Sequence, residues 1–264
     1  MTTPFARLFE PIRVGGQTIP NRLFVSAHHT YFVEPDPTGF HRFTLLGQRA
    51  VDYHAARAEG GFGLIVVGQT QVLPQSGDER PASYADEAIP RYRRLGEACH
   101  RFGTKVFVQL NQNGPEKSVS GPDSWEPAWG PTALATGEPQ ARGEMCKAMD
   151  DDDIAALVEG FVRSARNVRE AGLDGVEIHA AHPHMLGIWL SPSRNHRTDR
   201  HGGSVAARVQ LVLEILAAVR AACPPPFVVG VRINGAWTQP AGQTLEEGIE
   251  IAQRIAATGQ CDFL

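Results

Sequence analysis

The chain has 264 residues, of which 42% are hydrophobic and 20% are charged, and its formal net charge at pH 7 is -4. This composition is typical of a globular protein and excludes collagen-like, coiled-coil and disordered chains. The negative net charge argues against nucleic acid as the main partner, because phosphate binding needs a basic surface. The sequence has no long uncharged apolar stretch for a membrane span, no signal-peptide core and no CxxC among its four cysteines. We therefore expect a cytoplasmic protein that is not associated with a membrane.

The first half of the chain alternates between apolar strand patterns and helical patterns. The patterns predict, in chain order, a strand, a helix, a strand, a helix and a strand at 22–26, 45–59, 64–67, 90–102 and 105–110. Gly60 and Gly103 follow the two helices, as glycine commonly does at a helix end. An irregular segment rich in Gly and Pro then extends from 111 to about 149, and loops of this length in compact domains are usually functional.

The second half repeats the same alternation. Apolar residues recur at helical spacing from Ile154 to Val168, and the acidic run 150–153 suits the positive end of this helix. The remaining patterns predict a strand, a helix, a strand, a helix and the start of a strand at 175–179, 204–222, 227–233, 245–257 and 262–264.

Strands that alternate strictly with helices predict a parallel sheet, either closed as a (β/α)8 barrel or open and doubly wound. The open dinucleotide-binding form carries a glycine fingerprint after its first strand, and 26–37 has none. The residues with chemical potential also follow the carboxyl ends of several strands, where barrels place their active sites. We therefore expect one domain, 1–264, folded as an incomplete α/β TIM barrel. We expect this barrel to contain about six of the eight strand-helix units and to lack the last two.

His179 and His182 are the strongest candidates for chemistry, because a predicted strand delivers the first and the second follows in the turn. Two imidazoles at a strand exit can donate hydrogen bonds to a carbonyl or carboxylate oxygen. Metal binding is the alternative, but no carboxylate or cysteine stands beside them at ligand spacing. The expectation is therefore a site without metal.

Arg232 lies within an apolar strand, where a guanidinium needs either an ion pair with a neighbouring strand or an electron-rich ligand. Gln109 ends another strand and offers an amide, although a structural role explains it equally well. His28 and His29 follow the first strand, where a solvent-facing position also explains them. Arg197 and Asp199 suit either a loop-stabilising ion pair or contacts with a ligand, and we favour the ion pair.

These residues lie in motifs that resemble the old yellow enzyme family of NADH:flavin oxidoreductases. The segment DGVEIHAAH at 174–182 continues into LSPSRNHRTDRHGGS at 190–204, and the N-terminal LFEPIRVGG and the VGVRI strand also match. The branch that contains 2,4-dienoyl-CoA reductase and trimethylamine dehydrogenase is the most similar.

The resemblance implies a barrel that binds flavin mononucleotide (FMN) and takes electrons from NAD(P)H. It implies that Gln109 contacts the pyrimidine edge of the flavin and that Arg232 stabilises the reduced, anionic ring. His179 and His182 would hold the carbonyl oxygen of an α,β-unsaturated small-molecule substrate while the flavin transfers hydride. The residues implied to flank the ring are Ala27, His28, His29 and Gln69.

The chain departs from the family pattern at several positions. Where the family reads HAAHGYL, this chain reads HAAHPHM, so His184 replaces the tyrosine proposed as proton donor. His29 stands where some relatives carry a cysteine, so no covalent cysteine–flavin bond is expected. The loops that grip the flavin phosphate follow strands seven and eight in the family, and this sequence ends before them.

Other functions stay open at this point. One alternative is a flavin-dependent amine or N-methyl dehydrogenase that passes electrons to a carrier protein. Another is a truncated, inactive barrel fragment, and a metal-dependent lyase or aldolase is the more remote option. Self-association into a homo-oligomer is also left open.

Overall fold

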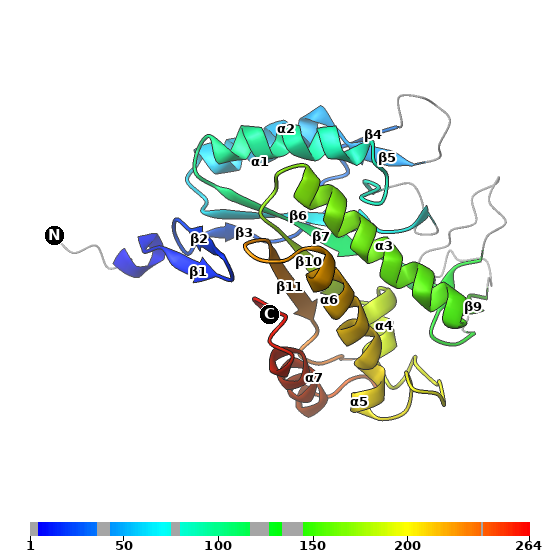
Figure 1. The fold of residues 1–264 in the computed structure, drawn as a ribbon. Helices are drawn as coiled ribbons and strands as arrows, with labels where there is room; N and C mark the ends of the chain where they lie inside the picture. The colour runs from blue at the N-terminus through cyan, green and yellow to red at the C-terminus, as the bar shows by residue number, and fades with distance from the viewer. Residues whose placement is uncertain (1–4, 36–42, 75–79, 117–126, 134–144, 239) are drawn as a thin grey trace.

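The computed structural model describes residues 5–35, 43–74, 80–116, 127–133, 145–238 and 240–264, and its main sheet has five parallel strands (Figure 1). In spatial order these are β3 (Phe24–Val25), β6 (Leu64–Gln71), β7 (Lys105–Asn111), β10 (Gly175–Ala180) and β11 (Val228–Ile233). Spatial order therefore equals chain order, and all four pairs are parallel. A doubly wound sheet reverses its order at a switch point, whereas a barrel does not. The sheet is the wall of an incomplete (β/α)8 barrel, as predicted.

Helices connect these strands and pack against the outer face of the sheet (Figure 1). The long ones are α1 (Gln48–Glu59), α2 (Ala88–His100), α3 (Asp151–Glu170), α6 (Gln210–Ala222) and α7 (Leu245–Ala257), and the bounds of α7 match the prediction. Two shorter helices, α4 (Met185–Leu190) and α5 (Val205–Arg208), lie in the connection between β10 and α6. In the described part of the chain, no helix combines the length and apolar character that crossing a membrane requires.

Alternation along the strands separates two apolar clusters. On β7, Val106 and Val108 face the helices in the large core, whereas Phe107 faces inward and packs with Ile19, Val66 and Val228. Strand residues alternate between faces, so the inward cluster fills the amino-terminal half of the sheet's concave side. The carboxyl-terminal half of that side is left for polar residues.

Two predicted helices differ from expectation. Leu45 and Leu46 belong to β5 (Thr44–Leu46), which pairs with β4 (Val33–Pro35), and α1 begins only after Gly47. Two adjacent leucines suit either a buried strand or a helix, and antiparallel pairing with the preceding strand β4 selects the strand. The helix predicted at 204–222 is divided at Val209 into α5 and α6. Here the guanidinium of Arg208 turns inward and donates to the carbonyls of Leu190 and Gly203.

Smaller elements complete the description. The hairpin of β1 (Ile12–Val14) and β2 (Gln17–Ile19) turns at Gly15-Gly16, as predicted, and its Gln17 donates to the Pro226 carbonyl. The hairpin therefore lies beside the amino-terminal end of β11. The predicted irregular segment 111–149 falls partly outside the described residues. The short elements not yet named are η1 (Ala6–Phe9), η3 (Gly114–Glu116), β8 (Trp129–Gly130) and β9 (Lys147–Ala148).

Candidate active site

The register of the parallel strands places polar inward-facing residues in two layers above the apolar one. Gln109 of β7 and Glu177 of β10 occupy one layer, beside Gly230 of β11, which has no side chain. His179 of β10 and Arg232 of β11 are paired in the next, at the carboxyl-terminal end. His179, Gln109 and Arg232 thus point to the same region, at the end where barrels carry their active sites.

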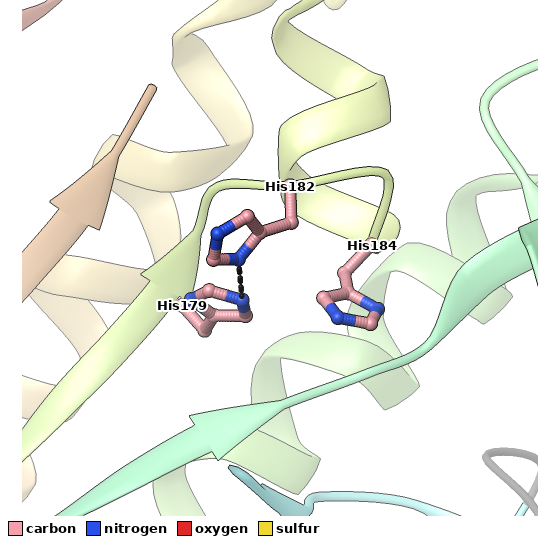
Figure 2. A group of neighbouring side chains, drawn as sticks. All are labelled: His179, His182 and His184. Atoms are coloured by element: carbon pink, nitrogen blue, oxygen red, sulfur yellow. Dashed lines mark hydrogen bonds between the residues drawn. The ribbon is translucent and has the colours of Figure 1, made fainter. Parts of the chain in front are cut away.

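Three histidines gather at the end of β10 (Figure 2). His179, only 1% exposed, is on the strand, His182 is in the turn, and His184 immediately precedes α4. Nδ1 of His182 lies 3.1 Å from Nε2 of His179. The ring centroids of His179 and His184 are 5.2 Å apart. We refer to these three residues as the histidine cluster.

The turn that carries His182 is held in an uncommon backbone conformation. His182 has φ of 57°, in the left-handed region that favours glycine. Its N–H donates to Oδ1 of Asn234 at 3.0 Å, which ties the turn to the loop after β11. On the other side, a Cβ on Gly187 would lie 2.1 Å from the His182 carbonyl oxygen. The turn is therefore fixed by an amide from a distant loop and by a glycine of α4.

Gln69 reaches the histidine cluster because β6 is irregular. The pairing of β6 with β7 shifts register between Val67 and Thr70, and such irregularities redirect side chains near active sites. The amide nitrogen of Gln69 lies 2.7 Å from Nε2 of His184 and 3.3 Å from Nε2 of His179. Gln69 therefore bridges two of the three imidazoles.

Burial and the nearby Arg232 cation lower the pKa of two of the three imidazoles, His179 and His182. Burial lowers the pKa of His179 well below its ordinary value, and His184, His182 and Arg232 lower it further. Burial and Arg232 also lower the pKa of His182. Near pH 7 each of these two rings therefore offers one N–H donor and one nitrogen lone pair.

Gln109 and Arg232 differ in their hydrogen-bond partners. Gln109 donates its amide hydrogen to Glu177 at 2.5 Å, and both side chains are buried. Burial raises the pKa of Glu177, against the opposing effects of Gln109 and Arg232. Within the described ranges, Arg232 is half-buried and makes no hydrogen bond or ion pair. The sequence left two explanations for Arg232, an ion pair with a neighbouring strand or an electron-rich ligand. The described residues form no such ion pair.

The three residues predicted to flank the flavin after β3, Ala27, His28 and His29, make contacts in different parts of the structure. Ala27 packs against the inward-facing apolar cluster. The His28 ring turns to the helix layer, with Nε2 2.7 Å from the Tyr53 hydroxyl of α1 and Nδ1 2.9 Å from the Ser26 carbonyl oxygen. The His29 ring lies edge-on to Tyr31, with centroids 4.0 Å apart. Of these three residues, the structure places Ala27 against the inner face, and their contacts with a flavin stay predictions.

In the motif at 190–204, the predicted structural pair has a structural role. Arg197 pairs with Asp199, which confirms the expected ion pair, and donates to the carbonyls of Pro131 and Met149 at 2.9 and 2.7 Å. Asn195 donates to the carbonyls of Trp189 and His201. These bonds fix the loop against the segments that carry Pro131 and Met149.

Sequence reasoning missed three residues that shape the site. Glu177 was visible as a carboxylate inside a buried strand, which is a signal in itself because such a group needs a partner. Asn234 and Gly187 gave no signal, because their roles depend on the approach of the His182 turn to other segments.

The chain belongs to the NADH:flavin oxidoreductase / NADH oxidase family, whose model matches residues 7–261. It is 36% identical to N,N-dimethylglycine/sarcosine dehydrogenase of Chromohalobacter salexigens, over 98% of this chain and 36% of that protein. The fold matches a 2-naphthoyl-CoA reductase complex with a TM-score of 0.87 at 25% identity, covering 97% of this chain and 40% of that one.

An old yellow enzyme from Pichia sp. AKU4542 also matches, with a TM-score of 0.82 at 27% identity, over 97% of this chain and 69% of that one. These matches confirm the predicted family and fold. The chain spans little more than a third of the length of the dehydrogenase that it matches.

Proposed function

We propose that this chain carries the substrate and flavin-ring site of an FMN-dependent oxidoreductase that reduces an α,β-unsaturated carbonyl compound with electrons from NAD(P)H. The observation that carries the proposal is the histidine cluster next to Arg232 and Gln109, at the carboxyl-terminal end of one parallel sheet. Family membership supports the redox chemistry, and the site supports its location.

The residues present fit a flavin. Arg232 is a half-buried cation with no ion pair among the described residues, and an electron-rich ring would offset the cost of desolvating it. Gln109 lies one layer below, with its amide N–H directed to Glu177, so its carbonyl oxygen is available as an acceptor. We assign Arg232, Gln109, Gln69 and Ala27 to flavin contact. FMN would supply hydride transfer in this site.

The imidazoles would act on the substrate. His179 and His182 are neutral near pH 7 and hold N–H groups that can donate to a carbonyl oxygen, which draws negative charge onto that oxygen. His184 takes the place of the family's tyrosine and would donate the proton, since an imidazole exchanges protons near neutral pH. Burial of His179 excludes water from this contact.

Titration of the purified chain with FMN, followed by visible absorbance, tests the proposal. We expect a yellow complex, and we expect Arg232→Ala to weaken FMN binding by about 10- to 100-fold, the value of one charge-assisted hydrogen bond. Arg200→Ala is the matched control, because Arg200 lies in an exposed ion pair with Asp151. If the wild-type chain takes up no FMN, or both variants bind it equally, the assignment is wrong.

A second candidate is a dehydrogenase of N-methylated amines, supported by the similarity to N,N-dimethylglycine/sarcosine dehydrogenase. Anaerobic bleaching of the FMN complex separates the two candidates. An enone reductase is bleached by NADPH and recovers its colour with an enone, whereas an amine dehydrogenase is bleached by the amine itself. The cytoplasmic location and self-association also stay predictions.

A further inference from the structure

The histidine cluster has a property that substrate polarisation does not require. Among the described residues, each of His179, His182 and His184 offers a nitrogen, and the three nitrogens all lie within 4.8 Å of one another. From the sequence we expected no metal, because no third ligand stood beside His179 and His182. The structure supplies the third, because the turn after β10 folds His184 back toward the strand (Figure 2).

We propose that His179, His182 and His184 form a three-nitrogen site for a divalent transition-metal ion such as Zn²⁺. In a tetrahedral zinc site with Zn–N distances of about 2.0–2.1 Å, two ligand nitrogens lie about 3.3 Å apart. Nδ1 of His182 and Nε2 of His179 are 3.1 Å apart, so these two already have the required spacing.

Gln69 marks the position that the ion would take. Its amide nitrogen lies 2.7 Å from Nε2 of His184 and 3.3 Å from Nε2 of His179, so both ring nitrogens face one point. An ion bound here would replace the amide and lie closer to both ring nitrogens than the amide does, while the Gln69 side chain rotates away or presents its oxygen. Imidazole is a good ligand for zinc, copper and nickel, and is less suited to magnesium or calcium.

The surroundings define the remaining ligand and limit the affinity. Imidazole ligands carry no charge to offset that of the ion, and Arg232 adds a further positive charge near His179. We therefore expect an anion, such as hydroxide or azide, in the open position. Nδ1 of His179 is buried without a hydrogen-bond partner among the described residues. Without that outer hydrogen bond, we expect affinity about 10- to 100-fold below that of a site that has it.

This inference does not depend on a bound flavin, but it concerns the imidazoles proposed to hold the substrate oxygen. An ion in the cluster and a carbonyl ligand would exclude each other. The site is therefore a point at which a transition-metal ion would inhibit the enzyme.

Co²⁺ titration of the flavin-free chain, followed by its visible absorption, tests the site. We expect one Co²⁺ per chain with a four- or five-coordinate spectrum that changes when azide is added and disappears when Zn²⁺ is added. His184→Phe fills the same space without a nitrogen and should weaken Co²⁺ binding by more than about tenfold, since losing a ligand costs more than losing its outer partner. His196→Gln removes an exposed histidine outside the cluster and should leave binding unchanged.

Circular dichroism establishes that the variants fold. If His184→Phe does not fold, electron paramagnetic resonance of the wild-type chain with Cu²⁺ replaces it, and hyperfine coupling to imidazole nitrogens is the expected result. Wild-type chain that binds no Co²⁺, equal binding by His184→Phe, or a Cu²⁺ spectrum without nitrogen coupling would overturn the proposal. FMN binding is measured separately, so a failed metal site and a failed flavin site are distinguishable.

Discussion

Gly187 lets α4 lie directly against the turn of the histidine cluster. All six residues of α4 are buried, so the helix cannot move outward to make room for a larger side chain. A Cβ at Gly187 would meet the His182 carbonyl oxygen at 2.1 Å, well inside van der Waals contact. The position of His182 is therefore coupled to the size of one residue in the next helix.

We predict that Gly187→Ala destabilises the fold by about 1–3 kcal/mol, the usual cost of overpacking a buried site. Urea denaturation measures it. Gly235→Ala is the matched control, because a Cβ there meets nothing within 4 Å. It should change stability by less than about 0.5 kcal/mol. Equal stability of the two variants would show that α4 adjusts to the added methyl group.

At the level of elements, α1 carries a buried histidine, His54, near His28, which follows β3. His54 is 1% exposed, and its Nδ1 has no hydrogen-bond partner in the described part of the chain. Burial lowers the pKa of His54 to about 4, and the nearby His28 and Arg57 contribute to the shift. In the unfolded chain its ordinary pKa is 6.5. Between these values the unfolded state binds more protons than the folded state, so stability falls as the pH is lowered from 6.5 to 4.

We predict that His54→Leu reduces the loss of stability between pH 7 and pH 4, by up to roughly 3 kcal/mol for a shift of this size. Urea denaturation at several pH values measures the effect. Val51→Ala, at another buried position of α1, should lower stability by a similar amount at every pH. An unchanged pH profile in His54→Leu would contradict the argument.

Across the whole molecule, the candidate site is at the carboxyl-terminal ends of the strands, and a stabilising ion-pair network is at their amino-terminal ends. Asp174 immediately precedes β10, at its amino-terminal end, and its side chain connects three strand-helix units. It pairs with His100 of α2 at 2.7 Å and with Lys105 of β7 at 2.9 Å, and it accepts from the Val106 N–H. Burial opposes its charge, but these bonds outweigh burial and lower the pKa of Asp174 below its ordinary value of 3.8.

We predict that Asp174→Asn lowers stability at pH 7 by about 1–3 kcal/mol, because buried donors lose a charged acceptor. A group with a lowered folded pKa contributes fully above its unfolded pKa and loses that contribution as the pH falls through the folded value. The difference between wild type and variant should therefore shrink below pH 3.8. Urea denaturation at pH 7 and pH 3 tests this, with the exposed Asp151→Asn as control. FMN binding should be unaffected, since the flavin site is at the other end.

The sequence predicted the order of the strands and helices because burial periodicity is a local property. It located β6, β7, β10 and β11, and the bounds of α7, without reference to any contact. It failed at Leu45, where two leucines suited a helix as well as a strand and only pairing with β4 decided between them.

The sequence by itself determined the barrel class and the placement of His179 and Arg232, because parallel strands bring their carboxyl ends to one edge. The resemblance implied site roles for His184 and Gln69, but only the tertiary structure decided that the Gln69 amide bridges His184 and His179. That contact depends on the β6 register shift and on the turn held by Asn234 and Gly187. The contacts of Gln69 and Asn234 link segments far apart in the chain, and no local pattern of residues encodes the distance between them.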